Sequence, residues 1–112
     1  MHVADPVRRY AVTLVGATRD HPDLRLGASP RATLHLIRAA RASAALDGRD
    51  FVLPDDVQAL ASAVLAHRLL PTAQAQLNRR TPEQVVAEIL QRVPVPDPSA
   101  GRRPGMPGAR GL

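Results

Sequence analysis

The sequence contains no cysteine and no lysine, and aromatic residues make up only 2% of its 112 positions. The absence of cysteine excludes a disulfide framework, a thiolate metal site and a cysteine nucleophile. The absence of lysine excludes the G-x-x-x-x-G-K-[ST] loop, so the chain alone cannot bind and cleave a nucleotide by P-loop chemistry. No apolar run reaches the roughly 18 to 20 residues that span a bilayer, and the first residues lack a signal-peptide pattern. We therefore expect a cytoplasmic domain with an aliphatic core and no membrane contact.

The charge is positive but modest where the chain is expected to fold. All 15 basic residues are arginine and ten residues are acidic, which gives a formal net charge of +5. Residues 1–93 hold 12 arginines against nine acidic residues, and residues 94–112 hold three arginines against Asp97. So small an excess is a weak argument for a nucleic-acid partner. A small basic helical DNA-binding protein stays open as the alternative function, since the sequence pI is about 11.4.

Proline marks four places where a helix is expected to begin, because proline suits the first turn of a helix. These starts are Asp5-Pro6, Ser29-Pro30, Pro54 and Thr81-Pro82. Asp5 and Ser29 are expected to be N-caps, and Thr81 forms a capping box with Gln84. Leu53 cannot cap the third helix, so Asp55 and Asp56 must serve its exposed amides.

Each start is followed by residues that recur at helical spacing and can be buried together. They are Val7, Tyr10, Ala11, Leu14, Val15 and Thr18; Leu34, Leu36, Ile37, Ala40 and Ala44; Val57, Leu60, Ala61, Val64 and Leu65; and Val85, Val86, Ile89, Leu90 and Val93. His21-Pro22 should end the first helix and Gly48 the second.

These signals predict an all-α domain of four helices over residues 1–93, with one long connection at residues 69–80. Only Phe51-Val52-Leu53 could be extended, and three residues do not make a sheet. Nine of the last 20 residues are proline or glycine. We therefore predict a disordered tail over residues 94–112.

Most motifs for catalysis or metal binding are missing. The four histidines lack metal-ligand spacing, so no metal site is expected. Only two residues are glutamate, and no acidic pair lies on an apolar face where a pKa could be raised. The run from Gly27 to Arg31 begins like G-x-S-x-G, but it lacks the final glycine, and no strand is expected before it.

One segment indicates phosphate chemistry. Ser29-Pro30-Arg31 places an arginine near the start of a helix, where free N–H groups and the helix dipole favour an anion. Its guanidinium can donate two parallel hydrogen bonds to phosphate oxygens. His35 and Arg38 follow on the same stripe. The residues alone leave two interpretations open, a solvated polar face and a phosphate contact.

The pair His67-Arg68 is a second candidate. It follows the third helix directly, where cations suit the negative end of the helix dipole. It can be a structural cap of that helix, or it can contact a neighbouring subunit or domain.

In order and spacing, residues 5–96 resemble the carboxy-terminal lid of MoxR-type AAA+ ATPases. The resemblance rests on Tyr10-Ala-Val-Thr-Leu-Val, Ala17-Thr18-Arg19, His21-Pro22, Leu26-Gly-Ala-Ser-Pro-Arg-Ala32, Gly48-Arg49-Asp50-Phe51-Val52, Pro54-Asp55-Asp56-Val57, Leu65-Ala-His-Arg-Leu69 and residues 85–96. The sequence departs from the family pattern at Leu53, where serine or threonine is usual. A third possibility is a helical adaptor that only binds proteins, since amino-acid composition does not distinguish such an adaptor from a lid.

The resemblance implies a four-helix lid that works with a separate P-loop module, in the amino-terminal part of a longer ATPase. It implies that Arg31 is the sensor-2 arginine, which contacts the terminal phosphate of ATP within the same subunit or an adjacent one. Ser29 and His35 are expected beside it, and His67 and Arg68 at an interdomain contact. The full-length protein is expected to use ATP and Mg²⁺, whereas the fragment alone should be inactive and hold no cofactor.

The resemblance also implies partners for the full-length protein. A ring homo-oligomer is expected, with a hexamer as its size, and a protein with a von Willebrand factor A domain is an expected partner. The ring would carry out chaperone-like remodelling or maturation of client proteins.

Overall fold

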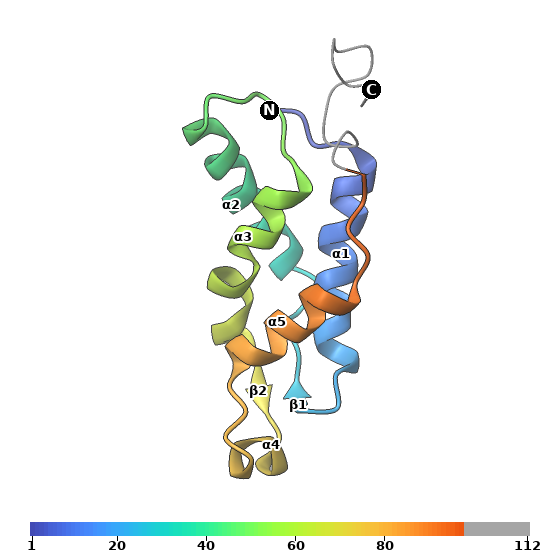
Figure 1. Ribbon diagram of the computed structural model, residues 1–112, viewed down its shortest axis with the longest axis vertical. Coiled ribbons are helices and arrows are strands. Elements are labelled where there is room, and N and C mark those ends of the chain that lie inside the picture. The colour runs from blue at the N-terminus through green and yellow to red at the C-terminus, as the bar shows by residue number, and fades with distance from the viewer. Residues whose placement is uncertain (98–112) are drawn as a thin grey trace.

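In the computed structural model, which describes residues 1–97, helices from along the whole described chain pack around one core (Figure 1). The elements within these residues are α1 (Asp5–Asp20), β1 (Leu24–Leu26), α2 (Ala32–Leu46), α3 (Pro54–Leu65), the 3₁₀ turn η1 (Ala66–Arg68), β2 (Leu70–Pro71), α4 (Ala73–Leu77) and α5 (Pro82–Arg92). The predicted all-α fold is confirmed. None of the helices in this part of the chain has the length and hydropathy to cross a membrane.

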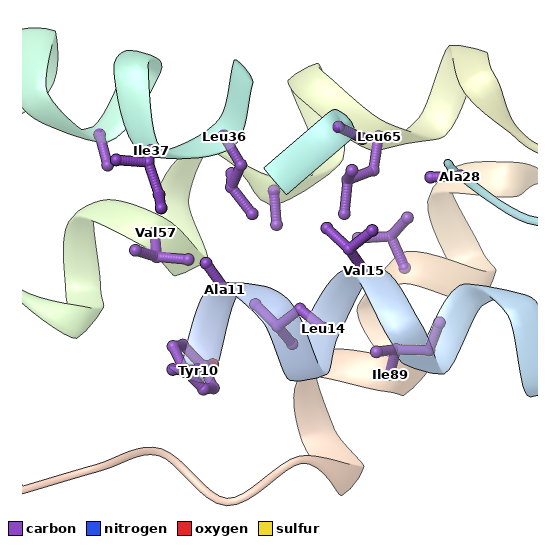
Figure 2. Close-up of a cluster of buried hydrophobic side chains, with 14 of the residues drawn as sticks. Tyr10, Ala11, Leu14, Val15, Ala28, Leu36, Ile37, Val57, Leu65 and Ile89 are labelled. Carbon is purple, nitrogen blue, oxygen red and sulfur yellow. The ribbon is translucent and has the colours of Figure 1, made fainter. Parts of the chain in front are cut away.

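The core is built from the helix faces that the sequence predicts. All six predicted residues of α1 are buried, from Val7 to Thr18. Figure 2 shows Leu14 and Val15 of α1 facing the side chains that α2, α3 and α5 contribute. Four other predicted residues are partly buried and pack against this core, namely Leu60, Val64, Leu90 and Val93, whereas the Leu34 side chain is 55% exposed. It lies two residues before buried Leu36, about 200° away around the helix, so the prediction that Leu34 is buried is wrong.

Several predicted helix ends are confirmed. The Thr81 hydroxyl accepts from the N–H of Gln84 at 3.1 Å, and the Gln84 side chain accepts from the N–H of Thr81 at 2.9 Å. Gly48 adopts a φ of +76° just after α2, and α1 ends before His21. Of the two acidic residues expected to serve the amides at the start of α3, Asp56 accepts from the N–H of Leu53 at 2.7 Å.

Two predicted N-caps are wrong. The carbonyl of Ala4 already accepts from the N–H groups of Val7 and Arg8, so Ala4 is the N-cap of α1 and Asp5 lies in the first turn. Ahead of α2, the carbonyl of Ser29 accepts from the N–H of Ala32 at 2.9 Å. This tight turn moves the helix start to Ala32, and Ser29 lies too early to cap it.

The predicted connection at residues 69–80 is partly structured. It contains β2 and α4, and the Thr72 hydroxyl caps α4 by accepting from the N–H of Ala75 at 3.0 Å. β2 pairs antiparallel with β1, with Leu26 opposite Leu70. Together with α4, this sheet forms the end of the molecule far from the amino terminus (Figure 1). The expectation that Phe51 belongs to the only extended segment is therefore wrong. The expectation that no strand precedes Gly27 is also wrong, because β1 ends at Leu26.

The first residues lie beside the loop between α2 and α3. The N–H of His2 donates to the carbonyl of Asp50 at 2.9 Å, and the N–H of Val52 donates to the carbonyl of His2 at 3.0 Å. Phe51 contributes only an isolated parallel bridge to His2. At the other end of the described chain, residues 94–97 form neither helix nor strand. The rest of the predicted tail, residues 98–112, lies outside the described residues.

Candidate functional site

Arg31 lies at the start of α2 with an exposed side chain. It is the N-cap residue, with helical backbone angles of φ −61° and ψ −26°. Among residues 1–97, no hydrogen bond or ion pair engages its guanidinium. Its own N–H also has no acceptor in this part of the chain. The residue therefore offers a free cation and a free backbone donor at the positive end of a helix.

Arg31 lines a surface hollow of about 320 Å³ on α2. The lining residues are Arg31, Leu34, His35 and Arg38. At 1.5 Å rise per residue, Arg31 and Arg38 are separated by about 10 Å along the helix axis. No acidic residue occurs between Ala32 and Leu46 to offset these charges. The hollow is therefore a positively charged surface with one exposed aliphatic side chain, which suits a polyphosphate.

The structure brings only part of the predicted site together. Arg31 and His35 share the hollow, with Arg38 of the same stripe. Ser29 is exposed but does not line it, and its hydroxyl makes no hydrogen bond within the described chain. Leu34 is a lining residue that the sequence did not predict, because an apolar side chain at this spacing is expected in the core. A helical wheel centred on Leu36 and Ile37 would have placed it outside.

The segment that leads into Arg31 is fixed to α1 by two contacts that the sequence analysis missed. The Thr18 hydroxyl accepts from the N–H of Ala28 at 2.9 Å and donates to the carbonyl of Val15 at 2.6 Å. At Gly27, an added Cβ would lie 2.5 Å from the carbonyl oxygen of Thr18. A hydroxyl on the buried face of α1 was the available signal, since a buried hydroxyl needs a hydrogen-bond partner.

A family model described as the AAA lid domain matches residues 16–89. The chain belongs to the AAA lid domain family. The sequence is 42% identical over 92 residues to the uncharacterized protein YeaC of Bacillus subtilis. It is 41% identical over 100 residues to the chaperone MoxR1 of Mycobacterium tuberculosis, and 36% identical over 110 residues to the protein MoxR of Paracoccus denitrificans.

These relatives are much longer than the lid. The alignments cover 82%, 81% and 85% of this chain, but only 29%, 26% and 32% of YeaC, MoxR1 and MoxR respectively. A crystal structure of a Cytophaga hutchinsonii protein assigned as an ATPase has a TM-score of 0.80 and 30% identity. That match covers 85% of this chain and 32% of the other. The chain is thus a lid region of a MoxR-type AAA+ ATPase, which favours the lid over the DNA-binding alternative.

The His67-Arg68 pair of the lid lies on η1, at the end of α3. The Arg68 guanidinium donates to the carbonyl of Val64, and it lies 3.0 Å from Nε2 of His67. It therefore satisfies a carbonyl at the end of α3, as the structural interpretation requires. His67 is exposed. The interdomain role of the pair stays a prediction.

A second polar cluster lies where the loop after α1 meets α5, and its groups are paired. Arg80 donates to Asp23 at 3.1 Å and to Glu88 at 2.5 Å. Glu88 also lies 3.2 Å from Nε2 of His21, and the hydrogen bond from Arg80, followed by that from His21, lowers the pKa of the Glu88 carboxyl. Within residues 1–97, no group of three metal-ligating side chains occurs. The cluster therefore joins α5 to the loop instead of offering a ligand site.

Proposed function

We propose that Arg31 is the sensor-2 arginine of a MoxR-type AAA+ ATPase and contacts the terminal phosphate of ATP held by a P-loop module outside this chain. The observation that carries this proposal is the free guanidinium of Arg31 at the start of α2. A cation at the positive end of a helix costs about 0.3–1 kcal/mol, which an anion bound there offsets. A planar guanidinium also matches phosphate oxygens in geometry.

The residues of the hollow fit a phosphate group but not a magnesium ion. Arg31 would donate to the terminal phosphate, and His35, one turn further along α2, would donate from its ring. Ser29 is close in sequence but would need to turn its hydroxyl toward the ligand. Mg²⁺ prefers carboxylate oxygens, and the hollow contains none. We therefore assign Mg²⁺ and the bulk of ATP binding to the P-loop module of the full-length ATPase.

We further propose that hydrolysis moves the lid and drives chaperone-like remodelling or maturation of client proteins. The relative named chaperone MoxR1 supports this role. A cytoplasmic homo-oligomeric ring, expected to be a hexamer, would place the lid near two nucleotides, so Arg31 can act on its own subunit or on a neighbour. The exposed His67, together with Arg68 beside it, would contact an adjacent domain. A protein with a von Willebrand factor A domain is the proposed partner of the ring.

The steady-state ATPase rate of the full-length protein tests the role of Arg31. Arg31→Ala should lower turnover by about a hundredfold, because it removes a donor aimed at developing phosphate charge. The side chain is exposed and unpaired within the described chain, and its charge is unfavourable at the positive end of α2, so the unfolding temperature of the lid should stay the same or rise slightly. Arg8→Ala, at an exposed arginine of α1 outside the hollow, is the matched control and should keep the wild-type rate. A near-normal rate in Arg31→Ala would remove this residue from the mechanism.

A further inference from the structure

We propose that Thr18 and Gly27 are positioning residues for Arg31, because they hold the segment that ends in Arg31 against the backbone of α1. The inference rests on the proposed function of Arg31. Neither Thr18 nor Gly27 lines the hollow on α2, so both would act on Arg31 from outside it.

The first contact is made by the hydroxyl of Thr18, whose residue is only 1% exposed. This hydroxyl is the acceptor for the N–H of Ala28, and it donates its own proton to Val15 within α1. Both capacities of the hydroxyl are therefore used in one buried arrangement. If the hydroxyl were removed, the N–H of Ala28 would be left buried without an acceptor, which is unfavourable.

The second contact is the close approach of Gly27 to α1. A Cβ at this position would lie 2.5 Å from the carbonyl oxygen of Thr18 and 2.7 Å from the nitrogen of Arg19. These are backbone atoms of a helix, so they cannot turn away as a flexible side chain could. Any larger residue at position 27 would push the segment off α1. Glycine is therefore required for the hydrogen bond between Thr18 and Ala28 to form.

These two contacts fix Arg31 because little freedom is left between them and α2. Ala28 and Ala32 are each 1% exposed and belong to the core, where Figure 2 places Ala28 in the buried cluster. Only Ser29, Pro30 and Arg31 lie between them. The ring of Pro30 restricts φ, and the hydrogen bond from Ala32 to Ser29 closes the turn. The place of Arg31 thus depends on where Ala28 is held.

Amide hydrogen exchange in the 112-residue chain tests the anchor itself. Thr18→Val keeps the shape of the side chain but removes the acceptor, so exchange at the Ala28 amide should accelerate by about tenfold or more. Thr18→Ser retains the hydroxyl and should restore protection. The amide of Ile89, in the core on α5, reports global stability and serves as the internal reference. If Ala28 exchanges no faster in Thr18→Val than in the wild type, relative to Ile89, the inference is overturned.

The turnover number of the full-length ATPase tests the consequence for Arg31. Thr18→Val should lower kcat about tenfold to a hundredfold, since small misplacements of a positioned group have effects of this size. Gly27→Ala should do the same if it folds. Combining Thr18→Val with Arg31→Ala should give no further loss beyond Arg31→Ala alone, because both changes remove the same contact. Losses that multiply would contradict a positioning role.

Two controls separate positioning from loss of stability and from failure of the proposed function. Val7→Ala empties a fully buried site in the first half of α1, away from Ala28, and should destabilise the lid while leaving kcat near normal. A loss of kcat in Val7→Ala equal to that in Thr18→Val would overturn the inference. A normal kcat in Arg31→Ala would overturn the proposed function and this inference together. A slow Arg31→Ala with a normal Thr18→Val would overturn the inference alone.

Discussion

Arg49 donates from two terminal nitrogens to the two carboxylate oxygens of Asp56, at 2.8 Å each, and so joins the loop after α2 to the start of α3. Burial of Asp56 disfavours its charged form, but the hydrogen bonds from Arg49 and the Leu53 amide outweigh it, so the pKa of this carboxyl lies below its ordinary value. A carboxyl whose pKa is lower in the folded than in the unfolded chain stabilises the fold above the unfolded pKa. That contribution is lost as the pH falls through the folded pKa.

We therefore predict how stability depends on pH. In the wild-type chain, the free energy of unfolding should be level near neutral pH and should fall below about pH 4. Asp56→Asn should lower it by about 2 kcal/mol at pH 7 and make the acid-side slope shallower. Urea unfolding at a series of pH values measures both effects. Asp55→Asn, at the exposed neighbour in the same first turn, is the control and should lower the free energy of unfolding by no more than about 0.3–1 kcal/mol, the contribution of its charge to the helix dipole. An unaltered slope in Asp56→Asn would contradict the assignment.

At the scale of elements, the predictable parts are the long helices with one clear face. α1 shows this best, because each position that its periodicity marks is buried. β1, β2 and α4 could not be predicted, since strands of two or three residues and a five-residue helix carry no periodicity. β1 and β2 are also brought together only by the tertiary fold. The cap expected at Ser29 is wrong because the hydrogen bond from Ala32 to Ser29 closes a tight turn before α2, and a turn of this length carries no periodicity in the sequence either.

Within residues 1–97, two residues at helix ends have left-handed backbone angles and give a paired prediction. Gly48 has φ +76° and Arg79 has φ +57°, a region that costs about 1–2 kcal/mol for residues other than glycine. Gly48→Ala should therefore lower the free energy of unfolding by about 1 kcal/mol, whereas Arg79→Gly should raise it by a few tenths to about 1 kcal/mol. Chemical unfolding of the two variants measures this. Changes of the same sign would contradict the two backbone conformations.

At the scale of the whole molecule, sequence motifs give a more specific hypothesis for the site than local physics does. The residues alone left Arg31 open between a solvated face and a phosphate contact, and the resemblance to MoxR-type lids favoured the second. The structure adds a free guanidinium in a hollow with His35 and Arg38. The exposure of Leu34 follows from its position on the helical wheel of α2. The partner of the Thr18 hydroxyl, the N–H of Ala28, could not be found without the way that the segment before α2 packs on α1.

The isolated lid should bind ATP only weakly. One arginine, one histidine and a helix end provide a few charge-assisted hydrogen bonds, and association of any ligand costs several kcal/mol. We expect a dissociation constant above about 1 mM for the 112-residue chain, measured by titration calorimetry with Mg²⁺ present. A micromolar dissociation constant would show that the lid binds the nucleotide by itself, and would contradict the assignment of most ATP binding to the P-loop module.

The central claim is that Arg31 contacts the terminal phosphate, and nucleotide affinities of the full-length ATPase test it most directly. A contact to this phosphate alone predicts that Arg31→Ala weakens binding of a non-hydrolysable ATP analogue about tenfold to a hundredfold and leaves ADP binding unchanged. Arg8→Ala should alter neither affinity. Equal losses for both nucleotides in Arg31→Ala, or no loss for either, would contradict the account.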